Sequence, residues 1–307
     1  PTGRRWTEAS FWAAHARREL EDESAARAHY ERVLDGDPFS YYGAQSAKAL
    51  GRAYPPSLAP EPGAEDPAWV QDAMIRLDLL REAGLTASAA FHVDRVTDRA
   101  GAEGGSSRYA LAEGLIDRGW TIEGINQGWA LVREGAGWNE RLLRIVYPFP
   151  NREMVEREAE EWGVDPFLMA GLIRQESAWD RDIVSSAGAV GLMQVMPSTG
   201  AQLARASGLD GFSTESLESA EVNLHLGARF LSEMLERFGP ELPLVLSAYN
   251  AGPTRANRWK DFPEHADPLR FTERIPFTET RGYVKNVTRN RELYRALYAD
   301  AEVVEQP

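Results

Sequence analysis

Apolar residues recur at helical spacing along this 307-residue chain, and its second half has few runs that alternate β-branched and polar residues. Phe167, Met169, Leu172 and Ile173 share one face of a helix for which Asp165 and Pro166 form a good start. Similar helical faces begin near Pro197 and cover Val222 to Leu235, Leu242 to Tyr249 and Thr278 to Leu297. Strands would instead show a period of two, so the pattern predicts an all-α fold.

The first half reads as a series of short amphipathic helices broken by Gly and Pro. Ala26, Tyr30 and Leu34 mark one helical face, which ends at Asp37-Pro38 because proline cannot continue a helix. An Ala, an aromatic residue four positions on and a closing Asp-Pro resemble one tetratricopeptide unit. No regular period repeats that unit, so an irregular array of helical hairpins is expected. Further helical patterns, after a Pro-rich loop at 55–67, cover residues 69–81, 87–97, 107–117 and 122–133.

The helical pattern breaks again at Tyr147, Pro148, Phe149 and Pro150. Domain boundaries fall in such segments, where few contacts cross. The sequence therefore predicts two domains, a helical accessory region at residues 1–146 and a compact all-α domain at residues 147–307.

Composition excludes several classes of function. The chain has 34 Lys and Arg against 47 Asp and Glu, a formal charge of −13, which disfavours nucleic acid as a partner. Cysteine is absent, so disulfides and thiol chemistry are excluded, and the five His show no metal-ligand spacing. We expect no metal and no cofactor. No segment approaches the roughly 20 apolar residues that span a bilayer, and a signal or lipid anchor upstream of Pro1 is left open.

Glu176 is the most informative position for chemistry. It follows Ile173, Leu172 and Met169 by three, four and seven residues, so its carboxyl lies at the end of an apolar stripe. Partial desolvation and the negative end of the helix dipole should both raise its pKa. A general acid that works near neutral pH needs such a shift. The alternative is a surface Glu paired with the adjacent Arg174.

Four motifs accompany this residue in order over roughly residues 147–298. Glu-Ser stands at 176–177, Gly-Leu-Met-Gln at 191–194, Ala-Tyr-Asn at 248–250, and Glu-Thr-Arg-x-Tyr-Val at 279–284. Each motif alone is weak, but the set is specific. The second half thus resembles the soluble lytic transglycosylases of the Slt type, in glycoside hydrolase family 23, whose catalytic domain is similar to goose-type lysozyme.

The resemblance implies a lytic transglycosylase that cleaves the β-1,4 bond between N-acetylmuramic acid and N-acetylglucosamine of peptidoglycan. In this family a single Glu, matched by Glu176, protonates the glycosidic oxygen, and the substrate N-acetyl group stabilises the positive charge. The same Glu then deprotonates the C6 hydroxyl, which closes a 1,6-anhydro ring. A second carboxylate is not needed, although Asp180, four residues after Glu176, and Asp182 are the nearest in sequence.

The resemblance also implies six substrate-binding residues, namely Ser185, Gln194, Met196, Tyr249, Asn250 and Glu279. Ser185 matches a serine that hydrogen-bonds near the acid, and Tyr249 a tyrosine beside the acid and the N-acetyl group. Gln194 suits hydrogen bonds to acetamido sugars, and Met196 offers an apolar surface to a sugar face.

For three of these residues a purely structural role is an alternative to substrate binding. Tyr249 would serve equally as a core aromatic, and Glu279 as a first-turn Glu at a helix N-terminus. Asn250 fits a role in shaping its loop better than direct contact with sugar. Met193 is expected in the core.

The first half resembles, less specifically, the superhelical regions that precede such catalytic domains. Its length suits a partial arc that supports the groove or docks another envelope protein. Six Trp in this half are candidates for stacking on glycan, with core packing as the alternative: Trp6, Trp12, Trp69, Trp120, Trp129 and Trp138.

The resulting expectation is a monomeric enzyme of the periplasm or cell envelope that acts on peptidoglycan strands. Two alternatives remain open at this point. One is a hydrolytic muramidase of the same fold, in which water replaces the C6 hydroxyl. The other is an inactive peptidoglycan-binding or scaffold protein.

Overall fold

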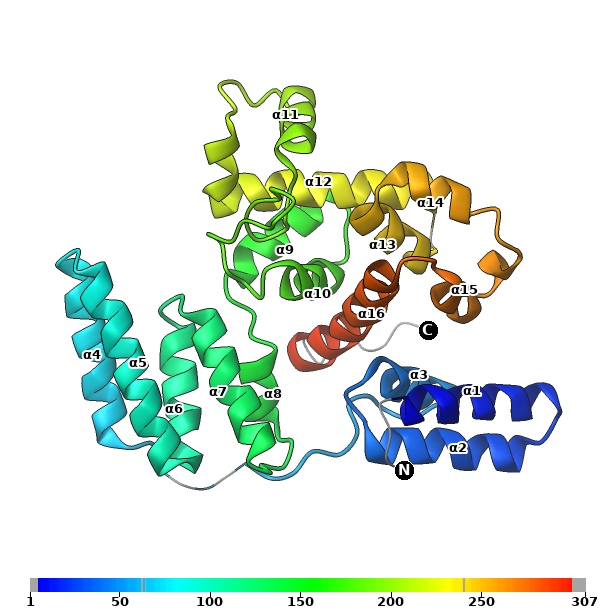
Figure 1. Cartoon of the computed structure of the whole chain (residues 1–307), viewed down its shortest axis with the longest axis horizontal. Helices are drawn as coiled ribbons and strands as arrows, with labels where there is room; N and C mark the ends of the chain where they lie inside the picture. The colour runs from blue at the N-terminus through cyan, green and yellow to red at the C-terminus, as the bar shows by residue number, and fades with distance from the viewer. Residues whose placement is uncertain (1–4, 62, 64, 240, 300–307) are drawn as a thin grey trace. The chain divides into compact units, whose positions relative to one another are not determined.

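A computed structural model describes residues 5–61, 63, 65–239 and 241–299. Within these residues the regular structure is helical, and β structure is limited to two isolated bridges, Val184 with Val190 and Val190 with Val195 (Figure 1). The predicted all-α fold is confirmed. No helix in the described ranges is long and apolar enough to cross a membrane. In the Pro-rich loop predicted at 55–67, Pro62 and Ala64 lie outside the described residues.

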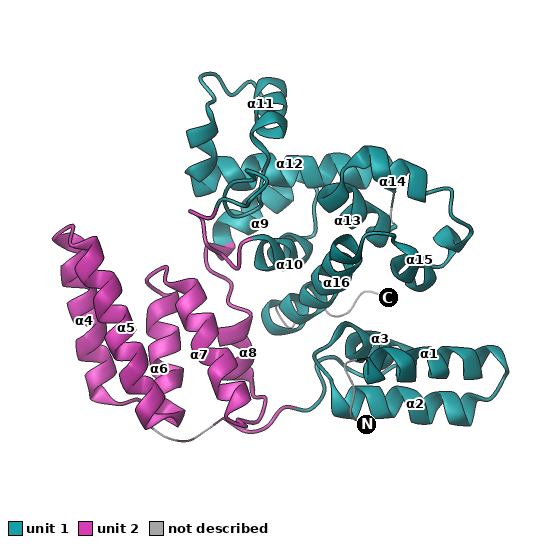
Figure 2. Ribbon diagram, viewed as in Figure 1, with its two compact units in different colours: residues 1–57, 153–176, 184–307 teal, residues 58–152, 177–183 magenta. Residues whose placement is uncertain are grey.

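The chain forms two compact units that are not continuous in sequence (Figure 2). Unit 1 comprises residues 1–57, 153–176 and 184–307, and unit 2 comprises residues 58–152 and 177–183. This grouping differs from the boundary expected between residues 146 and 147, which stays a prediction. The physical reason is tertiary contact, since the Nζ atom of Lys285 donates to the Tyr42 hydroxyl at 2.7 Å and joins the first helices to the last.

Unit 1 begins with three helices that share a small core. They are α1 (Trp6–Glu19), α2 (Glu23–Gly36) and α3 (Tyr41–Leu50). Phe11, Tyr30 and Val33 are buried between them, and α2 ends before Asp37-Pro38 as predicted. Helix α3 was not predicted from the sequence, and its start is capped by the Ser40 Oγ atom, which accepts from Gly43 N at 3.0 Å.

The rest of unit 1 carries the four motifs, apart from Ser177. Its helices are α9 (Arg152–Trp162), α10 (Pro166–Glu176), α11 (Pro197–Ala206), η1 (Thr214–Glu218), α12 (Ala220–Phe238), α13 (Leu242–Ala251), α14 (Pro253–Trp259), η2 (Pro263–Ala266), α15 (Pro268–Arg274) and α16 (Thr278–Tyr298). The helices predicted at 166, 197, 222–235, 242–249 and 278–297 all form. The short polar helices α9, α14 and α15 were not predicted, because few apolar residues mark them.

Unit 2 is an irregular array of helices in which each helix packs on the next along the chain. They are α4 (Ala68–Glu82), α5 (Thr86–Glu103), α6 (Gly105–Ile116), α7 (Thr121–Arg133) and α8 (Glu140–Val146). Leu77, Val93, Leu111 and Leu115 are buried in its core. Three Trp of this unit have structural contacts: Trp69 Nε1 donates to Glu103 at 2.7 Å, and the Trp129 and Trp138 rings meet edge to face at 6.0 Å.

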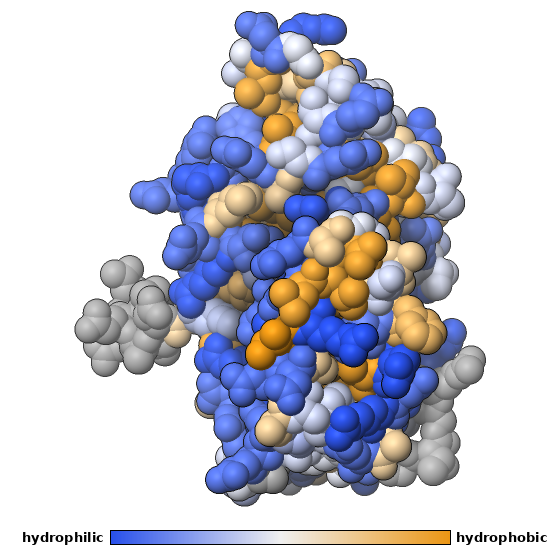
Figure 3. Space-filling view, turned by 90° about the vertical axis from the view of Figure 1, so that its left-hand side faces the viewer, coloured by the Kyte–Doolittle hydropathy of each residue, from blue (hydrophilic) through white to orange (hydrophobic). Residues whose placement is uncertain are grey.

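Large apolar side chains also lie on the outer surface of unit 2. Ile75 and Leu79 of α4 and Phe91 of α5 are 51%, 60% and 64% exposed. Figure 3 shows apolar side chains exposed among polar ones on the face of the molecule that it presents. Such residues are found where a helical array has no polar capping helix.

Candidate active site

Helix α10 places Glu176 as its last residue. Its start is fixed by Asp165, whose Oδ1 atom accepts from Phe167 N at 2.9 Å, which confirms the predicted N-cap. The Asp165 Oδ2 atom accepts from Arg291 at 2.6 Å and from Arg295 at 2.7 Å. Both arginines belong to α16, so the start of α10 is held against the C-terminal half of α16.

Further along, α10 and α16 approach each other closely at Gly171. A Cβ atom added there would lie 2.8 Å from the backbone N of Arg291, and Asn290 Nδ2 donates to Gly171 O at 3.0 Å. Only glycine allows this approach. With Asp165 opposite Arg291 and Arg295, the helices run antiparallel. The end of α10 therefore reaches the first turns of α16, which carry Glu279 and Tyr283.

The environment of Glu176 raises its pKa to about 7, and burial is the largest cause. The Tyr283 hydroxyl opposes this shift as a hydrogen-bond donor, and the negative charge of Glu279 adds to it. The upward shift predicted from the apolar stripe is confirmed. At a pKa near 7 the carboxyl is present in both protonation states at neutral pH, which suits a group that both donates and accepts protons.

Two tyrosines lie close enough to Glu176 for their own pKa values to respond to it. Burial raises the pKa of both Tyr249 and Tyr283, and the Glu176 charge raises each further. The Tyr249 hydroxyl donates to the Met193 carbonyl at 2.9 Å. The Tyr283 hydroxyl has no partner of normal hydrogen-bond length and angle among the described residues, but it lowers the pKa of Glu176 and Glu176 raises its pKa in turn.

The loop that carries Gly-Leu-Met-Gln is held by Asn223 of α12, which is 1% exposed. The Asn223 Oδ1 atom accepts from Met193 N at 2.8 Å, and its Nδ2 atom donates to Val190 O at 2.8 Å and to Leu217 O at 2.9 Å. Both N–H donors and the oxygen of this buried amide are thus engaged by this loop and by η1.

Gly191 is required by this arrangement for two reasons. Its φ angle is +76°, and an added Cβ would lie 2.4 Å from Asn223 Nδ2. Gly227 of α12 similarly leaves room for Met193, whose Sδ atom would lie 2.4 Å from an added Cβ. The side chain of Met193 is fully buried, as the sequence predicted.

Three predicted binding residues lie on this loop. The Ser185 Oγ atom accepts from Ala189 N at 3.0 Å, so its contact is to a local turn. Gln194 has a left-handed backbone, with φ at 49°, and its Nε2 atom donates to Gly191 O at 2.9 Å. Met196 is 40% exposed and offers an apolar surface to solvent.

Two further predicted binding residues, Asn250 and Glu279, lie at the end of α13 and at the start of α16. Asn250 Oδ1 accepts from the buried Thr280 hydroxyl at 2.7 Å, a contact that orders the two helix ends. Glu279 is exposed in the first turn of α16 and close enough to raise the pKa of Glu176. It is therefore the acidic side chain whose charge acts on the candidate acid.

In the structure Asp180 does not follow Glu176 by one turn of the same helix. Helix α10 ends at Glu176, and the next turn places Ala178 and Trp179 at left-handed φ angles of 50° and 71°. Asp180 Oδ1 accepts from Asp182 N at 3.0 Å, and Asp182 pairs with Arg181 at 3.4 Å. These contacts are those of carboxylates in a loop and give neither residue a place in the catalytic chemistry.

One group of side chains has the composition of a possible metal site. The ligand atoms of Glu158, Glu161 and His225 lie within 4.8 Å of one another. His225 Nδ1 and Glu158 Oε2 are already hydrogen-bonded at 2.9 Å, and Arg157 pairs with the same carboxylate. These contacts satisfy the buried Glu158 carboxylate and join α9 to α12.

Two residues that lie in the site, Tyr283 and Asn223, were assigned no role from the sequence. Tyr283 belongs to the fourth motif, and its position one helical turn after Glu279 was a usable signal. Asn223 stands among apolar residues on the buried face of α12, and a polar residue at such a place commonly has a structural partner.

Comparison with known families decides the identity of this part of the chain. A family model described as "Transglycosylase SLT domain" matches residues 153–269. This segment belongs to the SLT transglycosylase domain family. The SLT domain contains Glu176, the loop with Gly191 and Tyr249. A second family model, "Soluble lytic transglycosylase helical domain", matches residues 274–302, which include α16.

Individual proteins support the same assignment. The soluble lytic murein transglycosylase of Escherichia coli K12 is 33% identical over 181 residues, which are 57% of this chain and 28% of that protein. The crystal structure of the 70 kDa soluble lytic transglycosylase from E. coli matches with a TM-score of 0.79 at 26% identity, over 96% of this chain and 46% of that one.

An inactive mutant of the lytic transglycosylase Slt from Pseudomonas aeruginosa matches with a TM-score of 0.74 at 28% identity, over 94% of this chain and 46% of that chain. This chain therefore spans less than half the length of these relatives. The resemblance predicted from four motifs around the SLT domain is confirmed, and the helices of the first half share the relatives' fold as well.

Proposed function

We propose that this chain is a lytic transglycosylase that cleaves the β-1,4 bond between N-acetylmuramic acid and N-acetylglucosamine in peptidoglycan. The pKa of Glu176, raised to about 7 by burial, is the observation that carries the proposal. One such carboxyl can act first as acid and then as base at neutral pH. Membership of the SLT family and the names of the relatives support the same activity.

In the first step, protonated Glu176 gives its proton to the glycosidic oxygen, and the bond from that oxygen to the anomeric carbon breaks. The N-acetylglucosamine side leaves as an alcohol. The carbonyl oxygen of the muramic acid N-acetyl group stabilises the positive charge at the anomeric carbon. This step needs no carboxylate nucleophile, which agrees with the loop contacts of Asp180 and Asp182.

In the second step, ionised Glu176 takes the proton of the C6 hydroxyl. The freed oxygen bonds to the anomeric carbon, the N-acetyl oxygen is released, and a 1,6-anhydro ring forms. Glu176 is protonated again, so the cycle closes without consuming water.

The two tyrosines take different parts in this scheme. The Tyr249 proton is engaged by the Met193 carbonyl, so its oxygen remains available to accept the N–H of the substrate acetamido group. Tyr283 directs its hydroxyl to Glu176 and stabilises the carboxylate after the first proton transfer. Tyr249 is thus a substrate-binding residue and Tyr283 a positioning residue.

The remaining candidates frame the sugar site. We assign Gln194 and Met196 to contacts with sugar through an amide and an exposed thioether. Ser185 and Asn250 act through the turns that they stabilise, since their described contacts are to Ala189 N and Thr280. Glu279 keeps the pKa of the acid high through its charge.

The decisive experiment is mass spectrometry of purified sacculi digested with this chain. Anhydromuramic products, lighter by one water than hydrolysis products, are expected. Reducing ends alone would establish a hydrolytic muramidase instead. Glu176→Gln should remove the products, whereas Glu160→Gln, an exposed Glu of α9, should not. Full activity in the Glu176→Gln variant would sink the assignment of the acid, whereas absence of any cleavage products with the unaltered chain would favour a scaffold role.

Peptidoglycan as substrate places the protein in the cell envelope of a bacterium, and we propose that location. The names of the relatives as murein transglycosylases support it. From the sequence we still expect a monomer that needs no cofactor. We also expect that its first half can dock another envelope protein.

A further inference from the structure

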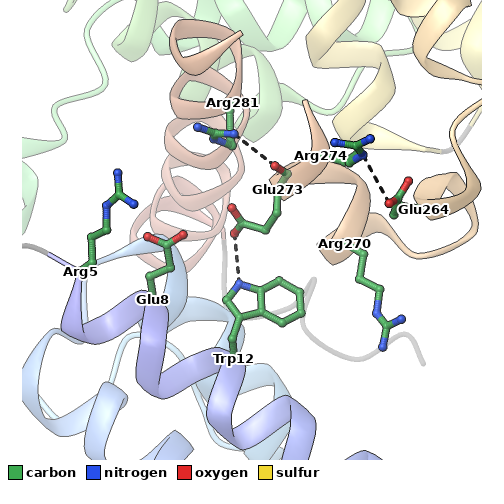
Figure 4. Close-up of a pocket in the computed structure, with 8 residues that line it drawn as sticks. All are labelled: Arg5, Glu8, Trp12, Glu264, Arg270, Glu273, Arg274 and Arg281. Atoms are coloured by element: carbon green, nitrogen blue, oxygen red, sulfur yellow. Dashed lines mark hydrogen bonds and ion pairs between the residues drawn. The ribbon is translucent and has the colours of Figure 1, made fainter. Parts of the chain in front are cut away.

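A pocket apart from the candidate active site lies within unit 1, between α1 and the segment that joins α15 to α16. Its volume is about 600 Å³, within the range of small-ligand sites. Arg5, Glu8 and Trp12 line one side, and Glu273, Arg274 and Arg281 line the other (Figure 4). Arg281 and Tyr283 are two residues apart on α16 and so point to different faces of that helix. The pocket is therefore separate from the candidate active site.

The carboxylate of Glu273 lines the pocket, and Lys285 already balances its negative charge. Glu273 Oε1 accepts from the Tyr42 hydroxyl at 2.6 Å, and Glu273 Oε2 pairs with Lys285 at 2.7 Å. Arg281 meets only carbonyl oxygens in this region, those of Glu273 at 3.2 Å and Ile275 at 3.3 Å. Its positive charge is consequently not balanced by Glu273.

A second cation stands free at the mouth. Arg5 is exposed, and its side chain makes no hydrogen bond or ion pair with any residue in the described ranges. Figure 4 shows it beside Glu8, on the side of the pocket that faces Arg281. Arg274 is 62% exposed, makes a long contact of 3.4 Å to Glu264, and has its guanidinium over the Phe262 ring, 5.6 Å from the centroid. Arg5, Arg274 and Arg281 thus offer donors to a carboxylate ligand.

The pocket also offers sites for a positive group. Glu8 has no ion-pair partner among the described residues. Glu264 Oε2 is buried and receives no hydrogen bond within the described part of the chain. A buried acceptor without a donor is costly, so an ammonium or amide N–H placed there would stabilise the complex.

An aromatic wall stands between these charges. The Trp12 ring lies beside Glu273, with its Nε1 atom 3.4 Å from the Glu273 Oε1 atom (Figure 4). A flat ring of this kind packs against amide planes and aliphatic carbon atoms. The wall therefore suits a chain that carries charges at both ends rather than a simple anion.

We propose that this pocket binds a short peptide that bears both carboxylates and an amine. The carboxylates would contact Arg5, Arg274 and Arg281, and the amine Glu8 or Glu264. The inference rests on the proposed function in one respect: with peptidoglycan as substrate, the bound segment is the peptide attached to the glycan strand. The pocket would then hold the peptide apart from the cleavage site.

Isothermal titration calorimetry of the full chain with the tripeptide L-Ala-γ-D-Glu-L-Lys tests the pocket directly. Saturable binding is expected, and it should be lost when the carboxylates of the peptide are amidated. Arg5→Ala and Arg274→Ala should each weaken binding about fivefold, as the loss of an exposed charge pair does. Arg205→Ala, an equally exposed arginine on α11, is the matched control and should not.

Equal effects of all three arginine variants, or no saturable binding, would overturn the proposal. The peptide has no glycosidic bond, so its binding is measured independently of cleavage. Glu176→Gln should bind the peptide as the unaltered chain does. Absent peptide binding with intact formation of anhydro products would reject the pocket alone, and the reverse result would reject the proposed catalysis alone.

Discussion

The hydroxyl of Tyr249 donates to the carbonyl oxygen of Met193 at 2.9 Å. This bond ties α13 to the Gly-Leu-Met-Gln loop and fixes which way the phenol presents its oxygen. Phe230 packs against the same ring, with the centroids 5.1 Å apart, so the ring has little freedom to turn. The position of the tyrosine is thus set before substrate arrives.

Tyr249→Phe should reduce both the stability of the loop and the rate of cleavage. The Met193 carbonyl would lose its donor, at a cost of about 1 kcal/mol in the free energy of unfolding. Urea unfolding measures that loss, and turnover of sacculi measures the effect on kcat. A variant with unchanged stability and unchanged kcat would contradict the assigned bond.

The raised pKa of Glu176 predicts an unusual dependence of stability on pH. The folded chain keeps the proton up to a pKa of about 7, whereas an ordinary Glu loses it near 4.5. The free energy of unfolding should therefore fall as pH rises between these values and stay lower above them. Glu176→Gln removes this titration and should stabilise the protein at pH 8 by up to about 3 kcal/mol.

Urea unfolding of the unaltered chain and the Glu176→Gln variant, near pH 4 and near pH 8, checks this prediction. Glu160→Gln on the exposed face of α9 is the control. A stability difference that does not change with pH would show that the Glu176 carboxyl titrates normally. An activity limb near pH 4.3, rather than near 7, would lead to the same conclusion.

Tyr283→Phe should move the pH profile of cleavage upward. The Tyr283 hydroxyl lowers the pKa of Glu176, so its removal leaves burial and Glu279 to raise that pKa further. The pH at which kcat/KM falls by half should increase, while KM changes little. Tyr30→Phe, a buried tyrosine on α2, should leave the profile in place. A loss of rate at every pH without a shift would indicate a purely structural role.

Gly171→Ala should loosen the contact between α10 and α16. The added methyl would lie 2.8 Å from the Arg291 backbone N, too close for any real Cβ. We expect a loss of about 1–3 kcal/mol in the free energy of unfolding, as for other overpacked sites. Gly282→Ala is the matched control on α16, because nothing lies within 4 Å of its added Cβ.

The control should behave in the opposite sense, since replacing glycine by alanine inside a helix adds about 0.5–1 kcal/mol of stability. Thermal unfolding of both variants separates the two effects. Similar Tm changes for the two would mean that the close approach at Gly171 is not needed.

Asn223→Ala should unfold the Gly-Leu-Met-Gln loop. Met193 N, Val190 O and Leu217 O would lose their shared partner in a buried site. A loss of about 3 kcal/mol is expected, with faster hydrogen exchange of the Met193 amide. Asn257→Ala, on the exposed side of α14, should change neither quantity. Protection of the Met193 amide in the Asn223→Ala variant would argue that the loop is held by other contacts.

Local patterns predicted the helices that carry the site. The Asp165 cap and the stripe from Met169 to Glu176 placed α10 and its terminal acid correctly, because both depend on neighbours within two turns. The upward direction of the Glu176 pKa followed from the same stripe. Helix α13 ends two residues after the predicted Tyr249, where Gly252 stops it.

Contacts between distant segments were beyond such patterns. Tyr283 acts on Glu176 only because α10 and α16 cross at Gly171, and no local spacing encodes that crossing. The grouping of the first three helices with the SLT domain likewise depends on Tyr42 meeting Lys285 and Glu273. Helix α9 was not predicted because Val155 and Ala159 are its only buried apolar residues.

The left-handed backbone at Ala178, Trp179 and Gln194 has an energetic consequence for anyone who engineers this protein. Each such residue with a side chain costs about 1–2 kcal/mol that glycine would avoid. Glycine at position 178 is thus a route to a more heat-resistant variant, since only a methyl group is lost. Glycine at position 179 would delete an indole that is 4% exposed and packs on Phe149, at a cost of about 3–5 kcal/mol. The turn after the acid therefore keeps its strained tryptophan because the contacts of that ring are worth more than the strain.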